Sequence, residues 1–266
     1  MSTPATSPMR DDAVTICAIS IVAFVVADML HEAVGHGFIA LLTGAQSGVV
    51  SSVAWSSTFD SRLVSAGGTL VNLAAGVIFW FAMRAARNAN MPTRVFLLLS
   101  CAFNLFDGTG YFFFSGVTDF GDWAAVIAGI HPHWLWRTLI AVSGLAAYFA
   151  VALGIGRAVV RYLDIPASDQ KRMRQLMFVS YFSAIAISVA AGLRNPIGMQ
   201  LLWQSALPAT AGANSGLLWL QYYIPRRLTP ERPPQPLNRS YAWISVAAAC
   251  AAVFIFVVGP GITLHR

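Results

Sequence analysis

The sequence predicts an all-α polytopic membrane protein with about six to seven transmembrane helices and a possible short surface β-hairpin after the first. Hydrophobic residues form 57% of the 266 residues, charged residues only 11%, and the mean hydropathy is +0.64. A soluble domain of this length needs far more charge to cover its surface. Apolar blocks of about 18 residues or more recur along the chain, and that length crosses about 30 Å of hydrocarbon.

Seven apolar segments are expected to span the membrane. No small-residue cleavage site follows the first, so we expect it to remain in the protein and not to act as a signal peptide. The sixth holds Gln200, Gln204, Pro208 and Asn214, which favours a broken helix that faces the interior of the bundle. The seven segments are residues 13–43, 64–83, 95–117, 134–156, 175–193, 197–224 and 241–262.

The chain is expected to form a single transmembrane domain, residues 13–262, whose metal-site core lies within about residues 13–130. Residues 1–12 are predicted to be a disordered cytoplasmic tail, and the Pro-rich basic stretch 226–240 an extended cytoplasmic loop. Residues 44–62 combine β-branched and aromatic residues with serines. That mixture indicates a short hairpin or strand at the membrane surface.

Basic residues are unevenly divided between the two sides of the predicted membrane. Most of the 17 are Arg10 or lie in the loops 84–94, 157–174 and 226–239, all on one side of a seven-span chain. The other side carries Arg62, Arg137, Arg194 and Arg266. The positive-inside rule then places the amino terminus in the cytoplasm, and we expect an integral protein of a bacterial inner (plasma) membrane. The net charge of +6 is therefore a topology signal, and no nucleic-acid partner is expected.

The first span carries four ionisable residues within the stretch DMLHEAVGHGFIA, residues 28–40. Ionisable groups in a membrane are costly, face the bundle interior and mark functional sites. On a regular α-helix Asp28, Glu32 and His36 form one stripe, because they are four residues apart. A zinc-binding HExxH motif also places its histidines four apart, whereas His31 and His36 are five apart. On a regular helix their rings therefore point about 140° apart.

Either of two local structures would bring metal-binding side chains of the first span together despite this spacing. A π-helical turn near Gly35 absorbs the extra residue and brings His31 and His36 onto one side, and such turns cluster at functional sites. Alternatively, Glu32 and His36 bind the metal directly, helped by Asp28. The competing interpretation is a buried hydrogen-bonded cluster that only joins helices.

The stretch HEAVGHGFIALLTGA, which begins at His31, resembles the first motif of the site-2 protease family of intramembrane zinc metallopeptidases. Two later stretches are also similar to that family. SAGGTLVNLAAG (65–76) resembles its small-residue segment that ends in an Asn, and NLFDGTGYFFFSGVTDFGDW (104–123) resembles the segment that carries an Asn and an Asp-Gly. The resemblance covers about residues 25–125. It implies one zinc ion, a transmembrane protein substrate within the lipid bilayer, and peptide hydrolysis by a zinc-activated water.

Carried over by position, the resemblance implies that His31 and His36 bind zinc and that Glu32 is the general base. The third ligand is Asp107, which precedes a glycine as in the family motif, or Asp122, at a predicted helix start. Asp122 is favoured because it lies on the same predicted outer side as the two histidines. Asp119 is a further, less favoured candidate for the third ligand. The family holds its metal near the cytoplasmic face, whereas the charge distribution places this cluster toward the outer face.

Asparagines in the later spans are candidate supporting residues. Asn72 or Asn104 donates a hydrogen bond to the developing oxyanion or to an unwound substrate strand, or else each joins two helices. Asn214 in the broken sixth span is a weaker candidate for the same cavity. The glycines of the second span are expected to let it approach the first span closely; they are Gly67, Gly68 and Gly76. His131 and His133 are expected at the outer interface beside two tryptophans.

Other functions remain open at the level of sequence. A di-iron membrane hydroxylase needs about eight histidines, and the chain has five without an HxxHH box, so that class is excluded. A zinc-dependent membrane lipid hydrolase would use the same ligand types. A transporter, or a relative without catalytic activity, would instead use the intramembrane carboxylates of Asp28, Glu32 and Asp107 as a proton or cation path.

Overall fold

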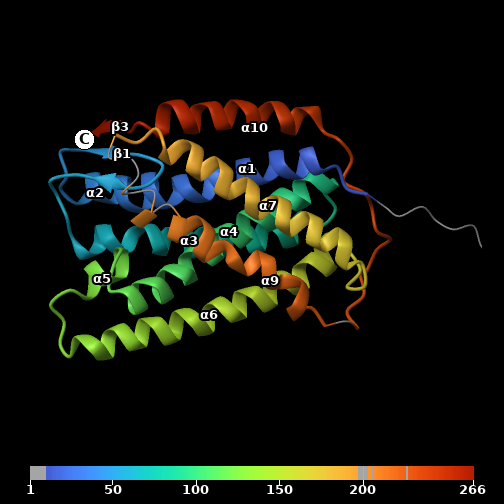
Figure 1. Ribbon diagram of the computed structural model, residues 1–266, viewed down its shortest axis with the longest axis horizontal. Helices are drawn as coiled ribbons and strands as arrows, with labels where there is room; N and C mark the ends of the chain where they lie inside the picture. Colours follow the sequence, from blue (N-terminus) through green and yellow to red (C-terminus); the bar gives the residue numbers. More distant parts are fainter. Residues whose placement is uncertain (1–9, 197–199, 201–202, 205–206, 226) are drawn as a thin grey trace, which may run out of the picture.

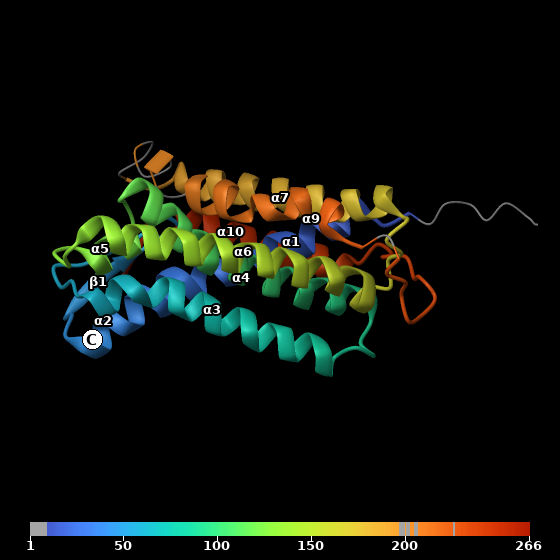
Figure 2. The ribbon, with the colours of Figure 1, turned by 90° about the horizontal axis from the view of Figure 1, so that it is seen from below.

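The computed structural model describes residues 10–196, 200, 203–204, 207–225 and 227–266. Six helices within these residues are long and apolar enough to cross a membrane, and they lie side by side along the long axis of the molecule (Figure 1, Figure 2). The predicted helical membrane fold is therefore confirmed. The six are Ala13–Thr43, Arg62–Ala85, Met91–Thr118, His133–Tyr162, Gln170–Gly192 and Tyr241–Val258.

The first and last of these helices each contain a π-helical section. The first consists of α1 (Ala13–Met29), η1 (Leu30–Phe38) and α2 (Ile39–Thr43), and the last of α10 (Tyr241–Val253) and η5 (Phe254–Val258). The other four are α3 (Arg62–Ala85), α4 (Met91–Thr118), α6 (His133–Tyr162) and α7 (Gln170–Gly192). A short helix, α5 (Asp122–Ile127), follows α4.

Side-chain caps define where several of the helices begin. The side chains of Asp12, Ser61, Asn90 and Ser240 accept hydrogen bonds from backbone N–H groups three residues further on, at the starts of α1, α3, α4 and α10. Each cap satisfies a donor that a helix start leaves free. Polar residues at the ends of apolar segments therefore set the helix boundaries, within a few residues of the predicted ones.

Helix α4 lies at the centre of the bundle and contacts α1, α3 and α6. Many of its apolar side chains are buried, including Leu98, Leu99, Phe103 and Phe106. Phe103 packs edge to face against Phe24 of α1, with ring centroids 5.7 Å apart. This packing fixes α1 against α4 one to two turns before the ionisable group of the first span.

A three-stranded antiparallel sheet covers the end of the bundle opposite the basic loops (Figure 1). Its strands β1 (Ser47–Val50) and β2 (Trp55–Ser56) confirm the predicted hairpin within residues 44–62. The third strand, β3 (Ile262–His265), was not predicted; it pairs with β1 on the side away from β2. The sheet therefore ties the carboxyl-terminal segment to the loop after the first span.

The predicted sixth span, residues 197–224, lies partly outside the described residues. The part that the structure describes is broken into η3 (Pro208–Gly212), η4 (Ala213–Ser215) and α9 (Gly216–Tyr223), so the expected break is confirmed. Tyr148 of α6 satisfies backbone groups at this break: its hydroxyl donates to the carbonyl of Ala213 (2.6 Å) and accepts from the N–H of Gly216 (2.6 Å). Asn214 is fully buried here, facing the interior as predicted.

A buried ion pair closes the opposite end of the bundle. Arg172 of α7 donates to both carboxylate oxygens of Asp11, at 2.7 and 2.9 Å, and to the carbonyl of Gln235. The N–H of Leu237 donates to the same carboxylate at 2.7 Å. Asp11 thus joins the start of α1, α7 and the loop 226–240. Residues 1–9 of the predicted tail lie outside the described residues.

Replacing Asp11 by Ala removes the carboxylate that neutralises the buried Arg172. We expect the free energy of unfolding to fall by about 3–5 kcal/mol, because a buried charge without its counter-charge is strongly destabilising. Thermal denaturation of the detergent-solubilised protein measures the change. Arg239→Ala is the matched control: it breaks the pair with Asp12 (3.1 Å), whose arginine is half-exposed, and is expected to change stability by less than about 1 kcal/mol. Equal effects of the two variants would contradict this assignment.

Candidate metal centre

The nine residues Leu30–Phe38, which contain both histidines of the first span, form a π-helix. A π-helix hydrogen-bonds residues five apart instead of four, so one turn accommodates the five-residue interval between His31 and His36. The two imidazole rings lie with centroids 4.8 Å apart. Of the two local structures considered above, the structure contains the π-helical turn.

Both histidines are buried and their Nε2 atoms point toward one place. His31 is 5% exposed and His36 is 8% exposed. Nδ1 of His36 lies 2.7 Å from the carbonyl oxygen of Val64 in α3. A ring nitrogen beside a carbonyl oxygen carries the proton, so the other nitrogen, Nε2, is left with a free lone pair. This contact therefore fixes both the orientation of His36 and its tautomer.

The third member of the group is Asp122, the first residue of α5. Its Oδ2 atom lies 3.2 Å from Nε2 of His31 and 3.4 Å from Nε2 of His36. The chain reaches this position through a left-handed residue, Asp119 (φ 57°), and through Gly121 (φ 82°), which turn it back over the end of α4. Burial disfavours the charged form of Asp122, but the two imidazoles outweigh this effect and lower the pKa of the carboxyl below its usual range.

The three side chains are arranged to hold a metal ion. Zinc bonds of about 2.0–2.1 Å in tetrahedral geometry separate two ligand atoms by about 3.3 Å, close to the two distances from Asp122. Although they are near each other, the buried atoms Nε2 of His31 and Oδ2 of Asp122 form no well-aligned hydrogen bond. Ligand atoms that converge without bonding one another are typical of a metal site. Of the described residues, His31, His36 and Asp122 form the group suited to hold a metal ion.

Two glycines of α3 make room for this arrangement. A Cβ atom on Gly68 would lie 2.5 Å from Nε2 of both His31 and His36. A Cβ atom on Gly67 would lie 1.8 Å from the carbonyl oxygen of Gly35. Any larger residue at either position would separate α3 from η1 or displace the imidazoles. The predicted close approach of the first two spans is thus confirmed at the site itself.

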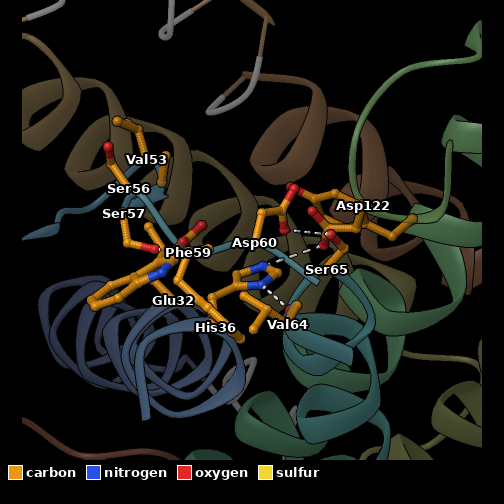
Figure 3. A pocket seen from close by; sticks show the side chains of 13 residues that line it. Glu32, His36, Val53, Ser56, Ser57, Phe59, Asp60, Val64, Ser65 and Asp122 are labelled. Carbon is orange, nitrogen blue, oxygen red and sulfur yellow. Dashed lines mark hydrogen bonds and ion pairs between the residues drawn. The ribbon is translucent and has the colours of Figure 1, made fainter. Parts of the chain in front are cut away.

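Glu32 is buried beside the histidines and faces a cavity of about 370 Å³ (Figure 3). Its Oε2 atom has no hydrogen-bond partner, while the backbone of Trp55 in β2 hydrogen-bonds the carboxylate. We call this cavity the outer chamber. His36 and Asp122 also line it, together with Val53, Ser56, Ser57, Phe59, Asp60, Val64 and Ser65.

Tyr111 of α4 is a site residue that the sequence analysis missed. Its ring stacks on His31, with centroids 4.9 Å apart and planes at 29°. It also lines the outer chamber. Tyr111 lies four residues after Asp107, in a run of aromatic residues, and nothing in that run distinguishes it from its neighbours. Its role depends on which face of α4 meets η1.

Two predicted carboxylates lie outside the metal group. Asp107 is buried in α4 and accepts a hydrogen bond from the side-chain amide of Asn214 (2.9 Å). Asp28 and Asp107 line a second cavity of about 20 Å³ on the inner side of His31, large enough for about one water molecule. The structure therefore brings Asp122, and not Asp107, to the two histidines, and Asn214 bonds the aspartate left outside.

The predicted supporting asparagines of α3 and α4 do not reach the site. Asn72 and Asn104 are fully buried, and neither lines the outer chamber. Asn104 donates to the carbonyl of Ser100 one turn earlier in its own helix (2.8 Å). Asp119 instead pairs with His133 at 3.0 Å, at the protein surface beside the exposed Trp134.

No protein-family model matches the chain, and no curated protein or solved structure matches it either.

Gly68→Ala is expected to lower zinc affinity about 10–100-fold, the range seen when residues that position metal ligands are changed, because the added methyl group displaces both imidazoles. Zinc content after purification and titration with a competing chelator measures the change. Gly76→Ala is the control on the same helix, since its Cβ would meet Leu105 at 2.5 Å, away from the site. Equal loss of zinc from both variants would mean that the packing of α3, and not the space that Gly68 leaves beside the two imidazole rings, controls zinc binding.

Asp122→Asn and Asp107→Asn separate the two aspartates that the sequence left open. The structure leads us to expect substoichiometric zinc in Asp122→Asn and full zinc in Asp107→Asn. Metal analysis of the purified variants tests this directly. Retention of zinc in Asp122→Asn together with loss in Asp107→Asn would contradict the geometry described here.

Proposed function

We propose that the protein is an intramembrane zinc metallopeptidase of the site-2 protease type, which hydrolyses peptide bonds of transmembrane protein substrates. The observation that carries this proposal is the convergence of His31, His36 and Asp122 on one point, with the buried carboxylate of Glu32 beside them. The resemblance of residues 25–125 to that family supports the same assignment. The six candidate spans place the site in an integral membrane protein.

His31, His36 and Asp122 would hold the ion, and two imidazoles with one carboxylate leave the fourth tetrahedral position open, as catalysis requires. A bound zinc ion supplies Lewis acidity and lowers the pKa of a water molecule toward about 7. Val64 keeps Nε2 of His36 available for the metal through its contact with Nδ1. The ring of Tyr111 restricts rotation of His31.

Glu32 is the general base in this proposal. Its Oε2 atom is buried without a partner and faces the outer chamber, where it can accept a proton from water and pass it to the leaving amine. The contact with the backbone of Trp55 holds the carboxylate in place. Because β2 supplies this contact, the surface sheet contributes to the position of the base.

The position of the site differs from that of the family in one respect. The metal group lies at the end of the bundle that carries the sheet and α5, opposite the basic loops (Figure 1). With the amino terminus in the cytoplasm, this end faces outward. The proposed activity therefore acts on substrates near the outer boundary of the membrane.

Glu32→Gln tests the assignment of the base. We expect hydrolysis of a membrane-embedded polypeptide to fall about 10²–10⁴-fold, the usual contribution of a general base, while bound zinc remains stoichiometric. Product formation by mass spectrometry and metal analysis on the same sample measure both quantities. Asp28→Asn is the matched control, because this buried carboxylate lies on the same helix but outside the metal group; it is expected to retain hydrolysis.

Full hydrolysis by Glu32→Gln would make the assignment of the base wrong. Absence of zinc from the wild-type protein would instead favour a transporter or a relative without catalytic activity. Zinc-dependent release of fatty acid from lipid, without cleavage of any polypeptide, would favour the lipid hydrolase.

A further inference from the structure

A third cavity, of about 850 Å³, opens beside the metal group between α4, α6 and the broken segment Pro208–Tyr223. We call it the apolar groove. Its walls are mainly aromatic and aliphatic, and among the described residues that line it Asp122 is the only charged one. Prominent lining residues are Phe113, Val117, Leu145, Phe149, Trp219 and Tyr223. Its volume lies within the range of about 300–1,000 Å³ that buries most of a ligand.

The apolar groove and the outer chamber meet at the metal group. Ala54, Tyr111 and Asp122 line both cavities. The outer chamber is polar, with Ser56, Ser57 and other hydrogen-bonding side chains, whereas the groove is apolar. A molecule that passes the metal group therefore has an apolar part on one side and a polar part on the other.

The groove extends from the metal group toward the middle of the bundle. It begins at Asp122, at the sheet end, and reaches Ala152 in the central part of α6 and Tyr223 at the end of α9. Several of its aromatic side chains are exposed on the bundle surface, including Phe113 (40%), Phe149 (45%) and Trp219 (56%). An apolar segment within the bilayer thus has access to the groove from the side.

The charge of the outer chamber indicates whether a phospholipid headgroup or a polar polypeptide segment fits there. The described residues that line it include Glu32, Asp60 and Asp122 but no lysine or arginine. Asp122 is paired with His31 and His36, but among the described residues no lysine or arginine lines the chamber beside Glu32 and Asp60. These two carboxyl groups repel a phosphate headgroup, because like charges in a confined site are unfavourable. A neutral or basic polar segment fits the outer chamber without this repulsion.

We propose that the apolar groove and the outer chamber bind the two sides of one scissile bond, at the outer membrane boundary of a polypeptide substrate. The last apolar residues of its transmembrane segment lie in the groove, and the neutral or basic flank lies in the outer chamber. This inference rests on the proposed peptidase function and assigns its substrate: a bond at the junction of an apolar and a polar segment, and not one in the middle of a transmembrane helix.

Binding can be tested separately from hydrolysis with the Glu32→Gln protein. The probe is a synthetic peptide with a Leu/Ala segment of about 20 residues and a Ser/Lys flank, with a benzophenone side chain on its last apolar residue. We expect cross-links to the groove, at Val117 or Trp219. Cross-links confined to other faces of the bundle would overturn the proposal.

Gly212→Phe fills the groove and provides a quantitative test. Gly212 lines the groove, and a Cβ there meets nothing within 4 Å, so the ring enters the open space without a clash at its base. We expect the Kd for the peptide to rise about tenfold, as for the loss of one buried apolar contact, with zinc content unchanged. Gly154→Phe is the control: its Cβ meets only Trp80, at 4.0 Å, and it does not line the groove. Equal affinities of the two variants would also overturn the proposal.

The preference of the outer chamber for a neutral or basic flank can be tested by comparing two peptides. A peptide with a Ser/Asp flank should bind about tenfold more weakly than the Ser/Lys peptide, and Asp60→Asn should reduce that difference. Asp60 is exposed at the chamber and is outside the metal group.

If a photoreactive fatty acid labels the groove and the peptide does not, the occupant is a lipid and this inference is wrong. If the peptide binds as expected but wild-type protein with zinc never cleaves it, the proposed hydrolysis fails while the groove assignment holds.

Discussion

The backbone contact between η1 and α3 is the constraint on which the rest of the site depends. Gly35 meets Gly67 and Gly68 so closely that no side chain fits between the two helices. This contact places the carbonyl of Val64 under His36 and leaves space above Gly68 for both imidazoles. Within a membrane, small residues allow this approach because association relies on packing rather than on the hydrophobic effect. The arrangement of the candidate metal ligands and the packing of the two helices are therefore set by the same three glycines.

The extra residue between His31 and His36 has a structural role of its own. A regular helix with histidines five positions apart would point one ring away from α3, whereas the π-helical turn keeps both on the same side. The turn also widens the helix locally. The π-helix packs against α3 and the strands β1 and β2, in keeping with the rule that irregular backbone in a membrane protein must be buried in protein or line a wet cavity.

The sequence was sufficient for six of the seven expected spans and for the two histidines of the candidate metal group, and it favoured Asp122 over Asp107 without deciding between them. Length and hydropathy predict membrane helices well because a lipid-exposed chain has few other ways to satisfy its backbone. The histidine spacing together with Gly35 made a π-turn one of two alternatives, and the structure contains it. The two aspartates were harder: Asp107 and Asp122 differ in which face of α4, or of the turn after it, approaches η1, and that depends on tertiary packing. The contributions of Tyr111 and Trp55 depend on the same packing. Strand β3 was missed because it has four residues and a partner more than 200 positions away.

The pairing of β3 with β1 has a consequence for how the protein matures. β1 is the central strand: one edge holds β2, whose Trp55 contacts Glu32, and the other holds Ile262–His265. The wall around Glu32 is thus complete only after the residues of β3 have left the ribosome and paired with β1. Every earlier helix can therefore form while the wall around Glu32 is still incomplete.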